Sequence, residues 1–192
     1  MSFEKTQTGL DYVPAKTALI VFQDNREQVL SGIWKPSLCG HNQSTVQISY
    51  EILTQSGNPL ADEFAESVSK AYTKLGSPSS ALFVKMDAKF DSILRIFRAG
   101  TQERMLFFLI RKWESRGTPL WATIRYELFY DLELTVYDRN GDSLASSRVQ
   151  NVVTKEEGSA TSMKKMQEMA DSTFKLQIRA LFDHPDIKKS LL

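Results

Sequence analysis

The residues best suited to chemistry in this sequence lie at Cys39-Gly40-His41, where a thiol and an imidazole are two positions apart. A Cys-x-His pair supplies two zinc ligands, but a protein zinc site uses three or four. The chain has one cysteine and one further histidine, His184, far away in sequence. A nucleophilic Cys–His pair is also disfavoured, because positions this close rarely aim their side chains at one another. We therefore predict an ordinary loop here, with no metal and no cofactor.

Asp24 and Arg26 form a second candidate group, because they lie at the end of the strand expected from the apolar residues 19–22. The two side chains could bind a charged ligand, or they could form an ion pair that holds the turn after a strand. Structural ion pairs are common, so the second interpretation is preferred. A deep pocket that contained Asp24, Arg26 and His41 would favour a hydrolase or a small-molecule site, and their dispersal on the surface would count against it.

Aromatic and basic side chains are interleaved between residues 111 and 137, and Trp113 lies among them. RNA-binding sheets stack bases on such aromatic residues. No ribonucleoprotein motif is present, however, and a formal net charge of +1 gives no general attraction to nucleic acid. We predict core packing with a few exposed aromatic residues and no nucleic-acid partner. Trp113 joins Asp24 and Arg26 as a candidate binding or structural residue.

Catalytic sequence motifs are absent, including phosphate-binding glycine-rich loops, Gly-x-Ser-x-Gly and His-Glu-x-x-His. We therefore predict that the protein is not an enzyme. A length of 192 residues with 42% hydrophobic and 24% charged residues is typical of one globular domain. Residues 1–16 are polar and show no periodicity, so we predict a flexible N-terminal tether followed by a single domain over residues 17–192.

The clearest structural signal runs from residue 121 to 150. Even positions from 122 to 136 are apolar or aromatic and most odd positions are polar, which is typical of a strand with one buried face. Asn140-Gly141 then predicts a two-residue type I′ turn and a long β-hairpin. The strand register that follows from this turn pairs apolar residues with apolar residues across the hairpin, Val136 with Ala145 and Leu132 with Val149. It also places the opposite charges of Glu133 and Arg148 facing each other.

Further strands are expected at residues 17–23, 45–53, 81–86 and 105–114, and loops at residues 27–44 and 155–159. Helices are expected from Asn58 to Gly76, from Asp87 to Gly100 and from about Ala160 to Phe182, where capping residues and apolar spacing agree. This order predicts an α+β fold with two layers, a mostly antiparallel twisted sheet with about three helices packed against it. We expect Met169 to be exposed and one core to contain Phe64, Val68, Leu109, Leu132 and Phe174.

Several short motifs resemble the YajG-like lipoproteins of the Gram-negative cell envelope over nearly the whole chain. The resemblance begins at Leu10-Asp11-Tyr12-Val13-Pro14 and continues with Asp24-Asn25-Arg26 and with the strand that ends at Trp113. The Asn140-Gly141 hairpin and the end of the last helix, Asp183-His184-Pro185, complete it. No lipobox cysteine precedes Leu10, so on this interpretation the signal peptide and the anchor cysteine have been removed.

The resemblance implies a non-enzymatic periplasmic domain that is lipid-anchored to a membrane, with the outer membrane preferred, and that acts through protein–protein contacts. Its partner would be an envelope protein, bound at an exposed strand edge or in a groove between sheet and helices. Two alternatives stay open. One is a small-molecule-binding or lipid-binding accessory subunit of an envelope transport system, and the other is a hydrolase with a site near Asp24, Arg26 and His41.

Overall fold

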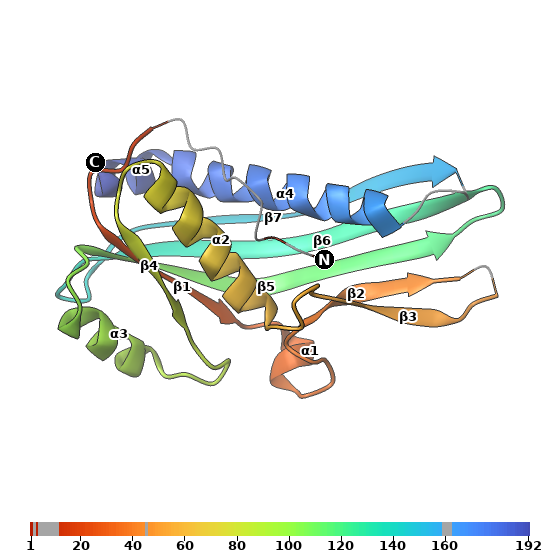
Figure 1. Cartoon of the computed structure of the whole chain (residues 1–192), viewed down its shortest axis with the longest axis horizontal. Helices are drawn as coiled ribbons and strands as arrows, with labels where there is room; N and C mark the ends of the chain where they lie inside the picture. Colours follow the sequence, from red (N-terminus) through yellow and green to blue (C-terminus); the bar gives the residue numbers. More distant parts are fainter. Residues whose placement is uncertain (2, 4–11, 45, 159–162) are drawn as a thin grey trace.

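A computed structural model describes residues 1, 3, 12–44, 46–158 and 163–192. The chain has an α+β fold in which a curled mixed sheet carries helices on both of its faces (Figure 1). The described strands are β1 (Ala18–Asp24), β2 (Leu38–Gln43), β3 (Ser49–Leu53), β4 (Ser79–Phe83), β5 (Arg104–Pro119), β6 (Thr123–Tyr137) and β7 (Ser143–Gly158). The described helices are α1 (Glu27–Leu30), α2 (Leu60–Lys74), α3 (Phe90–Ala99), α4 (Met163–Asp183) and α5 (Pro185–Leu191).

Strand β5 is the centre of the sheet. One of its edges pairs antiparallel with β6 along nearly the whole strand. Its other edge pairs in parallel with β1 in the first half and with β2 near the end. Because β4 also runs parallel to β1, the sheet is mixed: the expected antiparallel pairing holds for β2–β3, β5–β6 and β6–β7, whereas β1–β4, β1–β5 and β2–β5 pair in parallel. The α+β class is confirmed. The expected two layers are wrong, because helices cover both faces of the sheet, and the short helices α1 and α5 add to the three that the sequence predicts.

The two faces of the sheet are covered by different helices. Phe22, Leu106 and Phe108 face a large core beneath α2 and α4, whereas Val21 and Phe107 face a smaller core under α3. Consecutive strand residues point to opposite faces, which explains why β1 and the start of β5 are apolar on both sides. Of the expected shared core, Phe64, Val68, Leu132 and Phe174 lie together in the larger cluster. Leu109 was predicted wrongly, because it lies on the opposite face and packs with the smaller cluster.

Helix α4 buries a wider stripe than its sequence spacing predicts. Met169 is 1% exposed, so the expectation that it faces solvent is wrong. Met166, Met169, Ala170 and Thr173 follow helical spacing and lie against the concave side of the sheet, together with Phe174. No helix among the described residues is long and apolar enough to cross a bilayer.

The long hairpin has the predicted register but a different turn. Leu132 pairs with Val149, Glu133 with Arg148 and Val136 with Ala145. The turn itself has an extra residue: the Gly141 amide donates to the Asp138 carbonyl at 3.0 Å, and Gly141 has φ of +87°. A register shift between Val136 and Tyr137 compensates for the added residue. The apolar pairing therefore survives the longer loop, because slipping by one residue would turn the buried face outward.

Two segments that the sequence predicts as loops are strands. Residues 155–158 continue β7, and residues 38–43 within the expected loop form β2. Gly40 explains the second error. It has φ of +149°, and a Cβ atom at this position would lie 1.9 Å from the Ser115 carbonyl oxygen on β5. Here glycine permits close approach of two strand backbones and does not mark a loop.

The expected tether over residues 1–16 falls partly on residues 2 and 4–11, which lie outside the described residues. Among the described ones, Phe3 is buried in the core against Phe64 and Trp113. The Ala15 amide donates to the Leu191 carbonyl at 2.9 Å, and the Tyr72 hydroxyl donates to the Lys16 carbonyl at 2.8 Å. These contacts attach the start of the described chain to the helices around the core.

Candidate functional site

Asp24 and Arg26 form a buried ion pair where β1 ends. The Arg26 side chain is 1% exposed and that of Asp24 is 4% exposed. Arg26 Nε donates to Asp24 Oδ1 at 2.9 Å, and Arg26 Nη2 donates to Asp24 Oδ2 at 2.6 Å. The remaining guanidinium hydrogens reach the carbonyls of Pro36, Leu38 and Trp113. The pair thus joins the end of β1 to the start of β2 and to the middle of β5.

Trp113 lies in the core and is not available at the surface. Its ring packs edge-on against Phe3, Phe64 and Phe174, with centroid distances of 5.9, 5.0 and 6.1 Å. Its carbonyl accepts from Arg26, as described above, whereas its indole Nε1 is buried and has no hydrogen-bond partner among the described residues. The structure therefore brings Asp24, Arg26 and Trp113 together inside the fold.

Cys39 and His41 do not form a reactive pair. Cys39 is buried, and this burial raises the pKa of its thiol to about 12. A thiol in this state is a poor nucleophile and a poor metal ligand near neutral pH, because both roles need the thiolate. His41 packs edge-on against Trp34, with ring centroids 5.4 Å apart. Within the described part of the chain, no three His, Cys, Asp or Glu side chains are placed to hold a metal ion.

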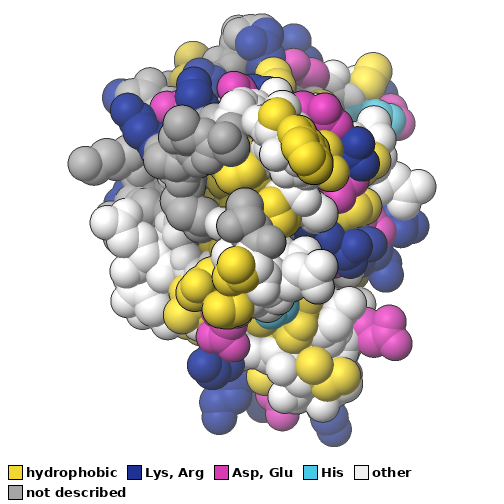
Figure 2. Space-filling model, turned by 90° about the vertical axis from the view of Figure 1, so that its right-hand side faces the viewer, with side chains coloured by type: hydrophobic (Ala, Val, Ile, Leu, Met, Phe, Trp, Pro, Cys, Tyr) yellow, Lys and Arg dark blue, Asp and Glu magenta, His cyan; other side chains and the backbone are white. Residues whose placement is uncertain are grey.

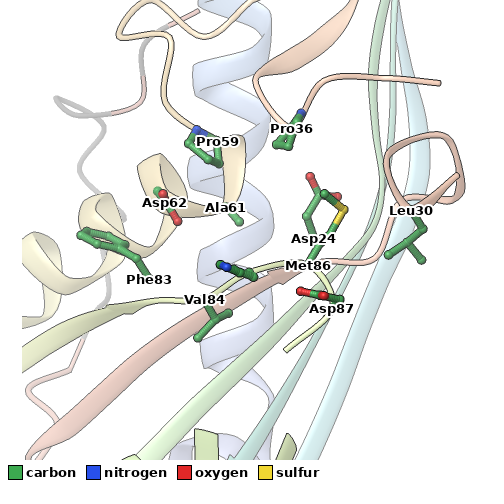
Figure 3. A pocket seen from close by; sticks show the side chains of 11 residues that line it. Asp24, Leu30, Pro36, Pro59, Ala61, Asp62, Phe83, Val84, Met86 and Asp87 are labelled. Carbon is green, nitrogen blue, oxygen red and sulfur yellow. The ribbon is translucent and has the colours of Figure 1, made fainter. Parts of the chain in front are cut away.

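A pocket of about 520 Å³ opens at the carboxyl ends of the parallel strands β1 and β4. Ligands of open α/β sheets often bind in this position. The first turn of α2 supplies Ala61 and Asp62, and the end of β4 with the segment after it supplies residues 83–87. Leu30 lies on the opposite side from Phe83, Pro36 and Pro59 lie near each other, and Asp24 lies between these groups (Figure 3). Of the three side chains whose grouping the sequence analysis considered, Asp24 alone lines this pocket, and Arg26 and His41 do not.

A second feature is an apolar end of the molecule, which we define as Val46, Ile48, Tyr50, Leu120 and Trp121. All five side chains are exposed, and Trp121 is fully so. They come from the β2–β3 hairpin and from the turn between β5 and β6. Because β2 runs beside the end of β5, both turns extend from the same end of the sheet, at the right of Figure 1. Figure 2 faces this end and shows groups of exposed hydrophobic side chains.

Sequence reasoning missed both features. The pocket combines Asp24 at the end of β1 with three short segments, residues 30–36, 59–62 and 83–87, and none of these segments has a distinctive motif. A usable signal was present in the strand–helix–strand order of β1, α2 and β4, because such a crossover normally joins parallel strands. Parallel pairing would then have placed the pocket at the strand ends.

Comparison with known proteins reveals distant structural likeness only. No family model matches the sequence, and no curated protein matches it. The fold resembles lipoprotein GNA1162 from Neisseria meningitidis, with 14% identity over 86% of this chain and 99% of that one and a TM-score of 0.32. It resembles a neuraminyllactose-binding hemagglutinin homolog from Helicobacter pylori, with 8% identity over 95% and 94% of the two chains and a TM-score of 0.38. It also resembles an uncharacterized protein, with 6% identity over 90% and 93% and a TM-score of 0.42.

Proposed function

We propose that this chain is a non-enzymatic binding domain that docks onto another protein through its apolar end. The observation that carries the proposal is the full exposure of Trp121 beside other exposed apolar side chains. Large apolar groups that gather on a surface commonly mark interaction sites. Tryptophan and tyrosine are also enriched among the residues that dominate binding energy in protein interfaces.

The charges near this end favour a protein partner over nucleic acid or an anionic membrane. Arg125 pairs with Glu156 at 2.8 Å, and Arg116 pairs with Glu114 at 2.5 Å. Each of these pairs places a carboxylate beside a guanidinium, so charges of both signs lie together near the apolar residues. Nucleic acid and anionic lipid are both recognised mainly by clustered positive charge. Mixed charge around an apolar centre instead resembles the rim and core of a protein interface.

The outer edge of β3 extends this docking surface. Among the described strands, β3 pairs only with β2, so its other edge is open for much of its length. At one end, Leu53 already accepts a hydrogen bond from the N-terminal amine of Met1. The partner would therefore meet the exposed apolar side chains first and could add backbone hydrogen bonds along the rest of the edge.

In-cell photo-crosslinking tests the docking proposal. We expect p-benzoylphenylalanine in place of Trp121 to form one adduct of defined mass in the native host. The same probe in place of Leu176, exposed on the outer side of α4, is the matched control and should form none. A second change within the apolar end, Ile48→Asn, should lower the adduct yield about fivefold or more, because it removes a neighbouring apolar contact. Equal crosslinking at positions 121 and 176, or no effect of Ile48→Asn, would contradict the proposal.

The cellular setting is a separate part of the proposal. We propose a YajG-like domain held at the envelope by acyl chains on the native N-terminus, and the short motifs quoted above support this. Because one acyl chain binds a bilayer only marginally, stable anchoring needs at least two. Expression of the complete gene should place the product in the membrane fraction, with the lipid mass on its mature N-terminus. A lipid-free product in the soluble fraction would refute the anchored state.

A further inference from the structure

The pocket at the ends of β1 and β4 is separate from the apolar end and has the dimensions of a ligand site. Its volume of about 520 Å³ lies within the roughly 300–1,000 Å³ of known small-molecule sites. Several elements form it: Ala61 and Asp62 belong to α2, Asp24 ends β1 and Phe83 ends β4, and the segments at Pro36 and at residues 84–87 complete the lining. The cavity is therefore a property of the sheet ends and not of one loop.

The wall of this pocket is mainly apolar, and part of it faces solvent. Leu30 is 48% exposed, Phe83 is 56% exposed and Met86 is 36% exposed. In Figure 3, Phe83 and Ala61 lie on one side of the space and Leu30 on the other. Such side chains lose their contact with water when an apolar group enters between them, which makes binding favourable.

The acidic side chains of the pocket differ in whether they have a partner. The Asp24 carboxylate is neutralised by Arg26. Asp62 has no hydrogen-bond or ion-pair partner among the described residues, and burial raises the pKa of its carboxyl above the ordinary value. Asp87 and Lys85 are exposed at the rim. With Asp24 and Arg26 cancelling, two carboxylates face one amine, so the pocket carries a net charge of −1 when both acids are ionised.

The same pocket offers fewer groups that could bind an anionic ligand. The N-terminus of α2 could attract an anion, but three of its first four amides already donate to backbone carbonyls. The Leu60 amide donates to the Pro36 carbonyl at 3.0 Å, and those of Asp62 and Glu63 donate to the Pro59 carbonyl. Lys85 remains as the single cation of the lining, and Asp62 and Asp87 oppose it.

We propose that this pocket binds a small amphipathic cation, with its apolar stem between Phe83 and Leu30 and its ammonium group at Asp62. The ammonium would compensate a partly desolvated carboxylate that the fold leaves without a partner. The stem would cover apolar surface that the fold leaves open. Neither contribution uses the apolar end, so this site and the proposed protein docking can be tested independently.

Three probes of equal chain length separate charge from apolar binding: octylammonium, octanol and octanoate. By calorimetry at neutral pH, we expect octylammonium to bind about tenfold more tightly than octanol and octanoate to bind most weakly. Amide chemical-shift changes on adding octylammonium should be concentrated in residues 84–87 and around Ala61. Asp62→Asn should remove the preference for octylammonium over octanol while leaving octanol binding unchanged.

Asp91→Asn is the matched control, because Asp91 also lies in the first turn of a helix, α3, but outside the pocket. It should leave the ranking of the three probes unchanged. Equal affinity for all three probes would overturn the proposal. So would tightest binding of octanoate that Lys85→Ala weakens, absence of binding, or shift changes confined to another surface. The ranking measured on the unaltered protein decides the matter even if a variant is unstable.

Discussion

Replacing Arg26 with methionine is expected to lower the free energy of unfolding by about 3–5 kcal/mol, because it leaves Asp24 as an unpaired charge in the interior. The guanidinium satisfies both oxygens of Asp24 and three backbone carbonyls from its 1%-exposed position. Methionine keeps an unbranched apolar stem that ends where the arginine Nε lies, and it offers none of these donors. The loss should appear in urea denaturation as a lower midpoint at unchanged slope, since the surface exposed on unfolding stays the same.

The surface pair Arg125–Glu156 provides a matched control for Arg26. Its two hydrogen bonds, at 2.9 and 2.8 Å, are also made by Nε and Nη2 of an arginine to a carboxylate. Both side chains are nearly half exposed, so Arg125→Met should cost less than about 1 kcal/mol. If Arg26→Met also costs less than about 1 kcal/mol, the buried pair does not hold β1, β2 and β5 together. The ligand-binding interpretation of Asp24 and Arg26 would then regain weight.

The strands could be predicted from sequence where one periodicity dominates. β6 alternates over its whole length, and the cross-strand pairs of Leu132, Glu133 and Val136 follow from where its turn falls. Their pairing survives a turn with one residue more than predicted, because burial of one face determines the register more strongly than the turn type does. The local sequence pattern was thus sufficient to predict the strand pairing of the hairpin.

The parallel strand pairs of the sheet could not be predicted from the local sequence pattern. Apolar residues on both faces of β1 predict a buried strand, but periodicity carries no information about the direction of its neighbours. The misplacement of Leu109 has the same origin, since the presence of α3 on the second face is a tertiary property. Which aromatic side chains of the sheet are exposed is also difficult to predict from the sequence. Trp121 reads like any other aromatic residue of the sheet until the geometry places it beyond the last strand pair.

Truncation of Phe174 to alanine is expected to cost about 3–5 kcal/mol, because the residue is fully buried where α4 meets the sheet and α2. Its ring stacks on Phe64 with centroids 4.1 Å apart and packs edge-on against Phe3 and Trp113 at 5.4 and 6.1 Å. Alanine would remove the apolar ring and leave a cavity among three aromatic neighbours that cannot all move in to fill it. Chemical denaturation measures the loss.

Leu176→Ala is the control on the same helix, since Leu176 is 60% exposed and its truncation should change the free energy of unfolding by less than about 0.5 kcal/mol. Comparing the two variants separates core packing from the helix propensity of α4, because both changes introduce alanine into the helix interior. If Phe174→Ala also costs less than about 1 kcal/mol, α4 contributes little to the core. Its buried stripe would then be peripheral, and the concave face of β5, β6 and β7 would be held chiefly by α2 and the strands themselves.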